Sequence, residues 1–378
     1  MLSLGTPGEQ QVRRIGDVTT EAGGVIRDVH IAFRFWGIPR VTATDSNVIL
    51  VNHALTGDAN AVDWWAGLIG PGLAIDTDVY CVICTNALGG CQGSTGPSSP
   101  HPDGRFWGSR FPAISIRDIV ATDHKLLTSL GIDRLAAVIG GSMGGARTLE
   151  WALMYPEMTT AALVLAVSAR ASAWQIGIQC AQIASIEKDP DWLGGDFYST
   201  GVSPDAGMAT ARKLAHLTYR GELEIDERFG TDPQEGEQPL GVFRSADERF
   251  AVESYLDYQA QKLLARFDAG SYVALTEALN RHDVGRGRGG LNKALASMSV
   301  PTFIVGVDTD ILYPYHQQEH LSRNVGNLLG MAKITSPVGH DAFLTETRQL
   351  DQIMRRFFRL LRAQGDRPLA AEGVDRHS

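Results

Sequence analysis

The residues most suggestive of chemistry lie in one glycine-rich stretch, 135–150, which reads L-A-A-V-I-G-G-S-M-G-G-A-R-T-L-E. Ser142 stands between two glycine pairs, after a short apolar run and before a helical pattern. Glycine accepts the strained backbone of a tight strand-to-helix turn, which bulky or β-branched residues resist. G-x-S-x-G at such a turn is typical of a nucleophile elbow, so Ser142 is the predicted nucleophile. The alternative is a glycine-rich turn without catalysis, such as a nucleotide-binding loop.

A serine nucleophile needs a general base, and the base needs an acid that fixes its tautomer. In α/β-hydrolases the acid and then the histidine follow the serine along the chain. His340 is the predicted base, because it stands in G-H-D directly after a strand-like run. The remaining C-terminal histidines fall on the surface of an expected helix or in the tail: His316, His320 and His377.

Two carboxylates are candidates for the orienting acid. Asp308 and Asp310 both follow the apolar run that ends at Gly306. The carboxyl end of a parallel strand faces the same side of the sheet as the elbow, so both fit by position.

An acyl-transfer site also needs two backbone N–H groups for the oxyanion. One is expected from Met143, the residue after the nucleophile. The other is expected from the loop that follows an earlier strand, A-L-T-G, where Leu55 is the predicted donor.

Short, continuous apolar runs predict strands that are buried on both faces of a parallel sheet. Helical patterns alternate with these runs, which indicates an α/β fold with crossover connections. The predicted strands are 30–36, 47–51, 79–84, 135–139, 161–167, 300–306 and 332–335, and the predicted helices are 115–129, 144–155 and 347–361.

Strand-like runs are missing between about residue 171 and residue 299, where helical periodicity takes over. This stretch is too long to be a loop. We therefore expect an α/β core of residues 1–170 and 299–364, a helical lid inserted at 171–298, and a polar, disordered tail at 365–378.

Composition excludes several classes of protein. The chain has 378 residues, 44% of them hydrophobic and 20% charged, as in an ordinary globular protein. A net charge of −9 argues against nucleic-acid binding. Residues 1–11 lack a signal-peptide pattern, and no apolar run approaches the roughly 18 residues of a membrane span. We expect a cytoplasmic enzyme.

The cysteines and histidines do not form a metal motif. Cys81 and Cys84 are spaced as C-x-x-C, but on a strand residues three apart point to opposite faces. Buried thiols are therefore the better interpretation. The ten histidines include no H-E-x-x-H, and we predict no metal site.

Beyond these residues, the chain resembles the homoserine O-acetyltransferases, a family with the α/β-hydrolase fold. The resemblance runs from about residue 29 to residue 361. It is carried by N-H-A-L-T-G from Asn52, N-A-L-G-G-C-Q-G-S-T-G-P-S-S-P from Asn86, G-G-S-M-G-G from Gly140, A-R-K-L-A-H-L-T-Y-R from Ala211, F-D-A-G-S-Y from Phe267, H-D-V-G-R-G-R-G-G from His282 and G-H-D-A-F-L from Gly339.

The resemblance implies a mostly parallel sheet flanked by helices, with Asp310 as the acid of the triad. It implies that Arg212 and Tyr219 meet the amino-acid substrate and that Asp341 lies beside the catalytic histidine. An arginine fork suits the α-carboxylate of homoserine, and Asp341 its α-ammonium group. Thr56 and Tyr219 would add hydrogen bonds.

The implied reaction moves an acetyl group from acetyl-CoA to the hydroxyl of L-homoserine through a Ser142 acyl-enzyme, feeding methionine biosynthesis. Acetyl-CoA is a co-substrate, and no permanently bound cofactor is expected. Alternatives are a serine-triad esterase or thioesterase, the same transfer with L-serine or succinyl-CoA, and a non-catalytic binding protein of the same fold.

The resemblance also implies a homodimer formed through the lid, without nucleic-acid or membrane partners. The stretch 281–290 is a candidate for the CoA phosphates, although a solvated glycine loop is the favoured interpretation. Three departures from the family pattern leave the triad untouched: Ala146-Arg147 where Met-Gln is commoner, Gly221 where Ser is frequent, and T-D-I-L-Y-P where S-D-x-L-F-P is usual.

Overall fold

The computed structural model describes residues 4–240 and 248–365. Apart from Gly365, which ends the last helix, the tail predicted to be disordered lies outside the described residues. None of the helices in the described part of the chain combines the length and the apolar character that a bilayer span requires.

An eight-stranded sheet forms the centre of the molecule, with the order β1-β2-β6-β3-β7-β8-β9-β10. The first two strands are antiparallel to their neighbours, and the strands from β6 to β10 in this order run parallel. Their bounds are β1 Gln11–Thr19, β2 Val25–Trp36, β3 Val48–Asn52, β6 Cys81–Thr85, β7 Ala137–Gly141, β8 Ala162–Leu165, β9 Thr302–Val307 and β10 Leu328–Ile334. A separate pair, β4 (Ile69–Gly70) and β5 (Ile75–Asp76), lies outside this sheet.

The central strands are apolar except at their ends, as at Asn52 and Thr85, because both faces of the sheet are covered. Along β3, Leu50 packs in one core with α2 (Ile116–Ser129) and α3 (Met143–Met154), whereas Ile49 and Val51 pack in a second core with α12 (Thr347–Gly365). Successive residues of a strand point to opposite faces, so a strand between two helical layers has no exposed position for a polar side chain.

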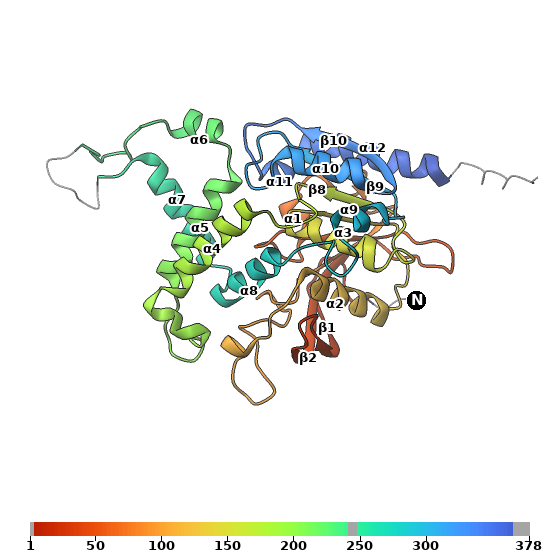
Figure 1. Ribbon diagram of the computed structural model, residues 1–378, viewed down its shortest axis with the longest axis horizontal. Coiled ribbons are helices and arrows are strands. Elements are labelled where there is room, and N and C mark those ends of the chain that lie inside the picture. The colour runs from red at the N-terminus through yellow and green to blue at the C-terminus, as the bar shows by residue number, and fades with distance from the viewer. Residues whose placement is uncertain (1–3, 241–247, 366–378) are drawn as a thin grey trace, which may run out of the picture.

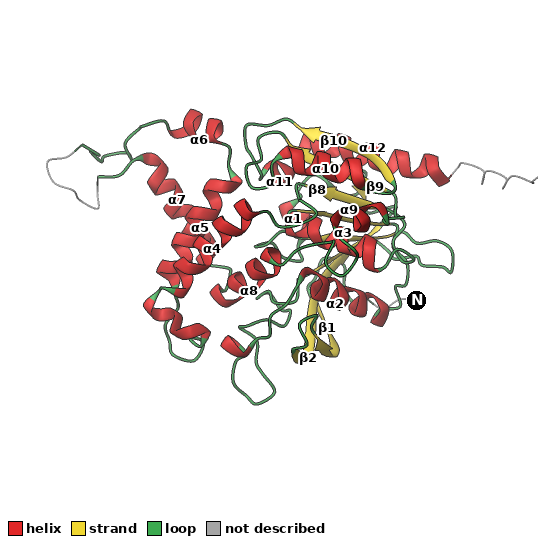
Figure 2. Ribbon diagram, viewed as in Figure 1, coloured by secondary structure: helices red, strands yellow, loops and turns green. Residues whose placement is uncertain are grey.

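The three helices predicted beside the strands are present (Figure 2): α2 and α3 lie within one residue of their predicted bounds, and α12 continues past its predicted end at residue 361. Ser115 caps α2 (Ile116–Ser129) and forms a capping box with Asp118. Helix α3 (Met143–Met154) follows the elbow directly, and α12 (Thr347–Gly365) closes the described chain. The shorter helices near the sheet are α1 (Ala61–Trp64), η1 (Gly108–Arg110), α9 (Leu291–Ala296), α10 (Tyr315–Asn324) and α11 (Ala342–Thr345).

The inserted region is helical and lies to one side of the sheet (Figure 1). Its elements are α4 (Ala173–Glu187), η2 (Pro190–Gly195), α5 (Asp205–Tyr219), α6 (Glu222–Phe229), α7 (Ala251–Leu264) and α8 (Ala269–Asn280). The chain enters and leaves it side by side: Ala171 N donates to His282 O at 2.9 Å, and Val284 N donates to Ala169 O at 3.0 Å. The bounds predicted for core and lid stay a prediction.

Candidate active site

Ser142 lies at a sharp turn between β7 and α3. Its backbone has φ 56° and ψ −124°, a conformation that costs a non-glycine residue about 1–3 kcal/mol. The turn requires glycine at position 144, because a Cβ there would lie 2.0 Å from the carbonyl oxygen of Asn52. The strain holds the serine side chain at the carboxyl edge of the sheet, as a nucleophile elbow requires.

The structure brings together the three residues predicted as a triad. Ser142 Oγ donates to His340 Nε2 at 2.9 Å, and His340 Nδ1 donates to Asp310 Oδ2 at 2.6 Å. The second oxygen, Asp310 Oδ1, accepts the backbone N–H groups of Leu312 and Tyr313, each at 2.8 Å. These bonds fix the carboxylate, which in turn fixes the imidazole with Nε2 toward the serine.

Burial and the carboxylate act in opposite directions on the pKa of His340. Burial disfavours the charged imidazolium, but the charge and hydrogen bond of Asp310 outweigh it, so the pKa is raised above its usual value. Only neutral His340 can accept the serine proton. Its basicity, once neutral, is enhanced by the same carboxylate.

The other candidate acid has a different role. Asp308 is exposed, and its Oδ1 accepts the N–H of Ser336 at 3.1 Å. It ties the end of β9 to the loop that leads to His340. The geometry therefore selects Asp310 over Asp308 as the partner of the imidazole.

The two predicted oxyanion donors come from different segments beside Ser142. Met143 begins α3, where the first N–H groups have no intrahelical acceptor. Leu55 lies in the loop after β3, in a turn closed by a bond of 2.9 Å from Gly57 N to Ala54 O. Among the described residues neither amide donates to a backbone carbonyl outside helices and strands.

A cavity of about 180 Å³ opens above the serine. Its walls include seven predicted site residues: Leu55, Thr56, Ser142, Arg212, Tyr219, His340 and Asp341. The lid provides Arg212 and Tyr219, which lie on α5, and the core provides the others.

Arg212 has the properties of a ligand-binding arginine. Its guanidinium lies 5.5 Å from the centre of the Tyr219 ring. Its Nε is buried and has no hydrogen-bond partner within the described residues. A buried, unpartnered donor is costly, so an anion that enters this cavity would gain a charge-assisted hydrogen bond there.

Asp341 is the acidic group of the same cavity. Burial raises its pKa, whereas the neighbouring His340, Arg212 and Arg220 lower it. Its backbone N–H donates to Tyr219 O at 3.0 Å, and Gly221 N donates to Val338 O at 2.7 Å, so the lid is paired with the histidine loop. A Cβ on Gly221 would lie 2.0 Å from the carbonyl oxygen of Pro337, which explains why glycine is needed here.

Sequence reasoning missed three residues around the site. Tyr313 is buried, and its ring centre lies 5.3 Å from that of His340. His53 is buried beside the oxyanion loop, where burial and then Arg147 lower its pKa to about 3. Arg266 lines the cavity from the lid. Only the position of His53 directly before A-L-T-G offered a signal in the sequence.

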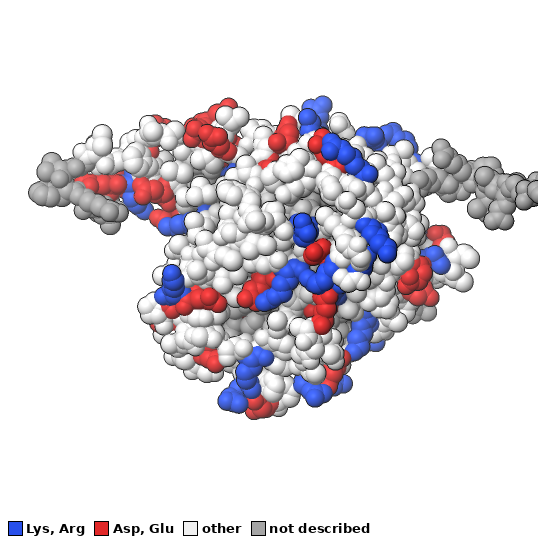
Figure 3. Space-filling model, viewed as in Figure 1, with Lys and Arg blue, Asp and Glu red and all other residues white. Residues whose placement is uncertain are grey.

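Arginine side chains of the basic stretch 281–290 form ion pairs with carboxylates. Arg286 pairs with Glu21 at 2.7 Å, and Arg288 pairs with the buried Glu150, also at 2.7 Å. Figure 3 shows basic and acidic side chains interleaved over this face of the molecule. These ion pairs make a phosphate site less favourable, and the solvated glycine loop stays the favoured interpretation.

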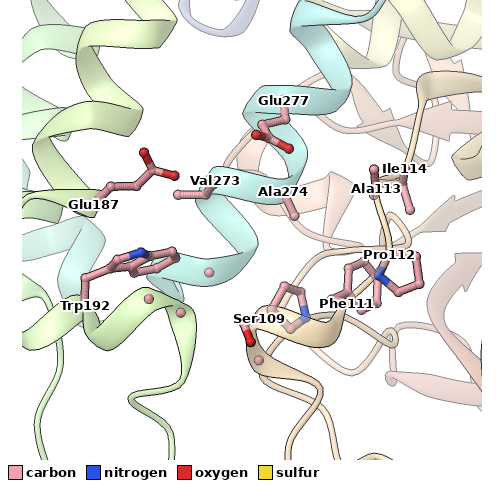
Figure 4. A pocket seen from close by; sticks show the side chains of 15 residues that line it. Ser109, Phe111, Pro112, Ala113, Ile114, Glu187, Trp192, Val273, Ala274 and Glu277 are labelled. Atoms are coloured by element: carbon pink, nitrogen blue, oxygen red, sulfur yellow. The ribbon is translucent and has the colours of Figure 1, made fainter. Parts of the chain in front are cut away.

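A larger cavity, of about 280 Å³, shares no lining residue with the one above Ser142. It lies between η1, η2 and α8, and Figure 4 shows the carboxylates of Glu187 and Glu277 and the indole of Trp192 around it. Its lining serine, Ser109, donates to the Asp196 carboxylate at 2.8 Å, and the lining includes no histidine, so the Ser–His pair is found only in the smaller of these two cavities.

The cysteines are free thiols, and Cys81 and Cys84 are buried in β6, as predicted. Burial raises the pKa of Cys81 to about 12. Within the described residues, no group of three or more histidine, cysteine or acidic side chains is arranged to hold a metal ion.

Comparison with known proteins agrees with this geometry. The family model of the alpha/beta hydrolase fold matches residues 47–347. Homoserine O-acetyltransferase of Corynebacterium efficiens is 66% identical over 369 residues, which cover 97% of this chain and 98% of that protein. Homoserine O-acetyltransferase of Mycolicibacterium paratuberculosis is 51% identical and covers 97% of this chain and 94% of its own.

A solved esterase superposes with a TM-score of 0.83 at 27% identity, covering 92% of this chain and 99% of its own. The site and these matches define a member of the alpha/beta hydrolase fold, which confirms the predicted fold class. Within that class, the chain belongs to the homoserine O-acetyltransferase family.

Proposed function

We propose that the protein transfers the acetyl group of acetyl-CoA to the γ-hydroxyl of L-homoserine through an acetyl-serine at Ser142. One observation carries the proposal: the unpartnered Arg212 guanidinium and the Asp341 carboxylate line the same cavity as the Ser142–His340 pair. This pair of opposite charges complements the carboxylate and ammonium groups of an amino acid. The names of the relatives support the same acceptor.

In the first half of the reaction, His340 accepts the Ser142 proton while Oγ attacks the thioester carbonyl. The tetrahedral oxyanion is stabilised by the N–H groups of Leu55 and Met143. When the C–S bond breaks, His340 returns the proton to the departing thiolate of CoA. Asp310 stabilises the imidazolium that exists between these two transfers.

In the second half, Arg212 binds the α-carboxylate of homoserine and Asp341 its ammonium group. Tyr219 and Thr56 add hydrogen bonds around them. His340 removes the proton from the γ-hydroxyl, the oxygen attacks the acyl carbon, and Ser142 leaves with the proton. Water is the competing nucleophile, so the lid favours transfer by excluding it.

Acetyl-CoA acts as a passing co-substrate, and no permanently bound cofactor takes part in this scheme. The product, O-acetyl-L-homoserine, would enter methionine biosynthesis in the cytoplasm.

A second candidate function is hydrolysis of esters or thioesters, since an esterase shares the fold. Intact mass of enzyme mixed with acetyl-CoA alone should show one added acetyl group, mapped to Ser142. Addition of homoserine should remove it and yield O-acetylhomoserine. Hydrolysis of acetyl-CoA at a rate unaffected by homoserine would favour the esterase, and transfer without any adduct would exclude the acyl-enzyme route. Assays with L-serine and succinyl-CoA test the other acceptor and donor.

We also propose a homodimer formed through the lid. Leu217 on α5 and Leu223 on α6 are 45% and 62% exposed, and they are apolar surface of the lid that a second copy could cover. Light scattering after size exclusion should give twice the monomer mass for the wild type. Leu223→Asp should shift it toward the monomer, and a monomeric wild type would contradict the proposal.

A further inference from the structure

The loop between α7 and α8 reaches from the lid to the oxyanion turn, residues 54–57, which carries the predicted oxyanion donor Leu55. From this loop, Arg266 Nη1 donates to the carbonyl oxygen of Thr56 at 2.6 Å, and the guanidinium also lines the cavity above Ser142. This contact joins residues 210 positions apart in the chain. It is a direct bond between the lid and the segment that carries Leu55.

The backbone around Arg266 is itself anchored to the core. Gln92 Nε2 donates to Arg266 O at 3.3 Å, and Asp268 N donates to Cys91 Sγ at 3.4 Å. Asp268 then caps α8 by accepting Ser271 N at 2.7 Å. The side chain of Arg266 therefore extends from a fixed base.

The oxyanion turn is held from both of its ends. At the start, Ala54 O accepts Gly57 N at 2.9 Å and His53 Nδ1 at 2.7 Å. At the other end, Thr56 O accepts Arg266. The Leu55 N–H shares a planar peptide group with the Ala54 carbonyl, so the bonds to Ala54 O set its direction, while the Arg266 bond holds the turn two peptide groups further along. Donors must be aimed at the oxyanion before the reaction to be fully effective.

Arg266 forms no ion pair within the described residues, unlike the arginines of the stretch 281–290. Its charge is therefore directed at the Thr56 carbonyl and the adjoining cavity. A carbonyl bound to a guanidinium makes a stronger hydrogen bond than one bound to a neutral donor.

We propose that Arg266 is a positioning residue through which the lid fixes the oxyanion turn, so that acylation of Ser142 depends on a lid side chain. The proposal rests on the function above, since it assumes a Ser142 acyl-enzyme and Leu55 as an oxyanion donor. It assigns the lid a part in the first half-reaction, in addition to binding the acceptor in the second.

The test uses p-nitrophenyl acetate, a neutral acyl donor that has neither CoA nor a carboxylate for an arginine to bind. In Arg266→Gln, the acylation rate constant should fall about 10- to 100-fold, less than the roughly 10²- to 10³-fold cost of removing an oxyanion donor, because the Leu55 N–H remains but is less well aimed. The KM for homoserine should change less than the acylation rate constant, because Arg212 and Asp341, which bind the charged groups of the acceptor in this proposal, form no hydrogen bond or ion pair with Arg266 in the described part of the chain. Arg266→Lys should recover part of the rate, since an ammonium can still donate to Thr56 O.

Arg228→Gln is the matched control. Arg228 is half exposed on the lid, and its guanidinium stacks on Tyr255 at 4.5 Å from the ring centre. The control should acylate like the wild type, and thermal unfolding should verify that all variants are folded.

Two results would overturn the inference: acylation of Arg266→Gln at the wild-type rate, or a loss confined to the KM of homoserine or acetyl-CoA, which would make Arg266 a ligand anchor. Either result leaves the acyl-enzyme proposal intact. If the wild type itself gives no Ser142 adduct with either donor, the proposed function fails and the inference fails with it.

Discussion

The core and the lid differ in how they are stabilised. Every residue of β3, β6, β7 and β9 is buried, and these strands or the turns after them carry Leu55, Ser142 and Asp310. The outer lid helices bury less: α6 has no buried residue, and α5 leaves Leu214 and Leu217 exposed, although α8 is mostly buried. The strained serine turn is packed within the core, whereas the proposed acceptor-binding residues Arg212 and Tyr219 lie on the less buried α5. The comparison teaches that the proposed triad is built on the buried core, whereas the lid adds these two residues to the cavity and Arg266 to the support of the Leu55 turn.

Removal of the nucleophile should have the largest effect. Ser142→Ala should reduce transfer by about 10⁴-fold or more, because residual catalysis from the oxyanion donors and substrate binding is all that remains. Mass spectrometry should show no acetyl adduct. An adduct on this variant would mean that another residue is acylated and that the core does not hold the chemistry.

Replacement of the acid should have the next largest effect. Asp310→Asn should lower kcat by about 10⁴-fold, since the imidazole loses the partner that fixes its tautomer. The carboxylate raises the pKa of His340 in the wild type. Its loss should therefore move the rising limb of the pH–rate profile to lower pH, because the neutral base then forms earlier.

Asp308→Asn is the control for this variant. Asp308 is exposed and only accepts Ser336 N, so the pH profile should stay where it is. Equal shifts in both variants would contradict the assignment of the acid.

Replacement of Arg212 should affect the second half-reaction and leave the first nearly unchanged. Arg212→Gln should lower kcat/KM for homoserine about 10- to 100-fold, the effect of losing a charge-assisted hydrogen bond of roughly 1.5–3 kcal/mol. Acylation by acetyl-CoA, followed by release of free thiol in a single turnover, should remain near the wild-type rate. Slow acylation in this variant would show that acceptor binding and acylation are not separable.

Disruption of the contact between Gly221 of the lid and the loop before His340 should have the smallest effect. In Gly221→Ala, the new methyl group would meet Pro337 O at 2.0 Å and force the two segments apart. We expect a loss of about 1–3 kcal/mol in unfolding free energy, measured with urea, and a severalfold drop in kcat. Gly177, whose Cβ position is open on α4, provides the matched control as Gly177→Ala. Equal unfolding free energies of the two variants would mean that the loop at Pro337 moves away from the new methyl group without cost, which would contradict the prediction.

Local patterns predicted most of the core and of the triad. Strands buried on both faces are apolar except at their ends, which is why the runs at 47–51 and 135–139 were visible, and the turn at Ser142 requires its glycines. Strand β1 was missed because it lies at the edge of the sheet, where exposed polar residues such as Arg13 and Arg14 are tolerated.

The contribution of the lid could not be found in the same way. Arg212 is one of several charged residues on a helix, and only the family resemblance indicated its role. Arg266 bonds to a carbonyl 210 residues away, and no periodicity or motif encodes a contact of that kind. Residues that act across the lid–core boundary depend on tertiary structure, which local sequence does not reveal.

The two crossings between core and lid, paired at Ala169–Val284 and Ala171–His282, also bear on how the family can diversify. Because the two ends of the insertion lie side by side, the insertion can leave and rejoin the core without displacing the flanking strands β8 and β9. Selection can therefore lengthen, shorten or replace everything between these ends while β8 and β9 stay hydrogen-bonded to each other. The fold can in this way exchange one acceptor for another, and an acyl-serine enzyme can become a transferase or an esterase, without rebuilding its catalytic sheet.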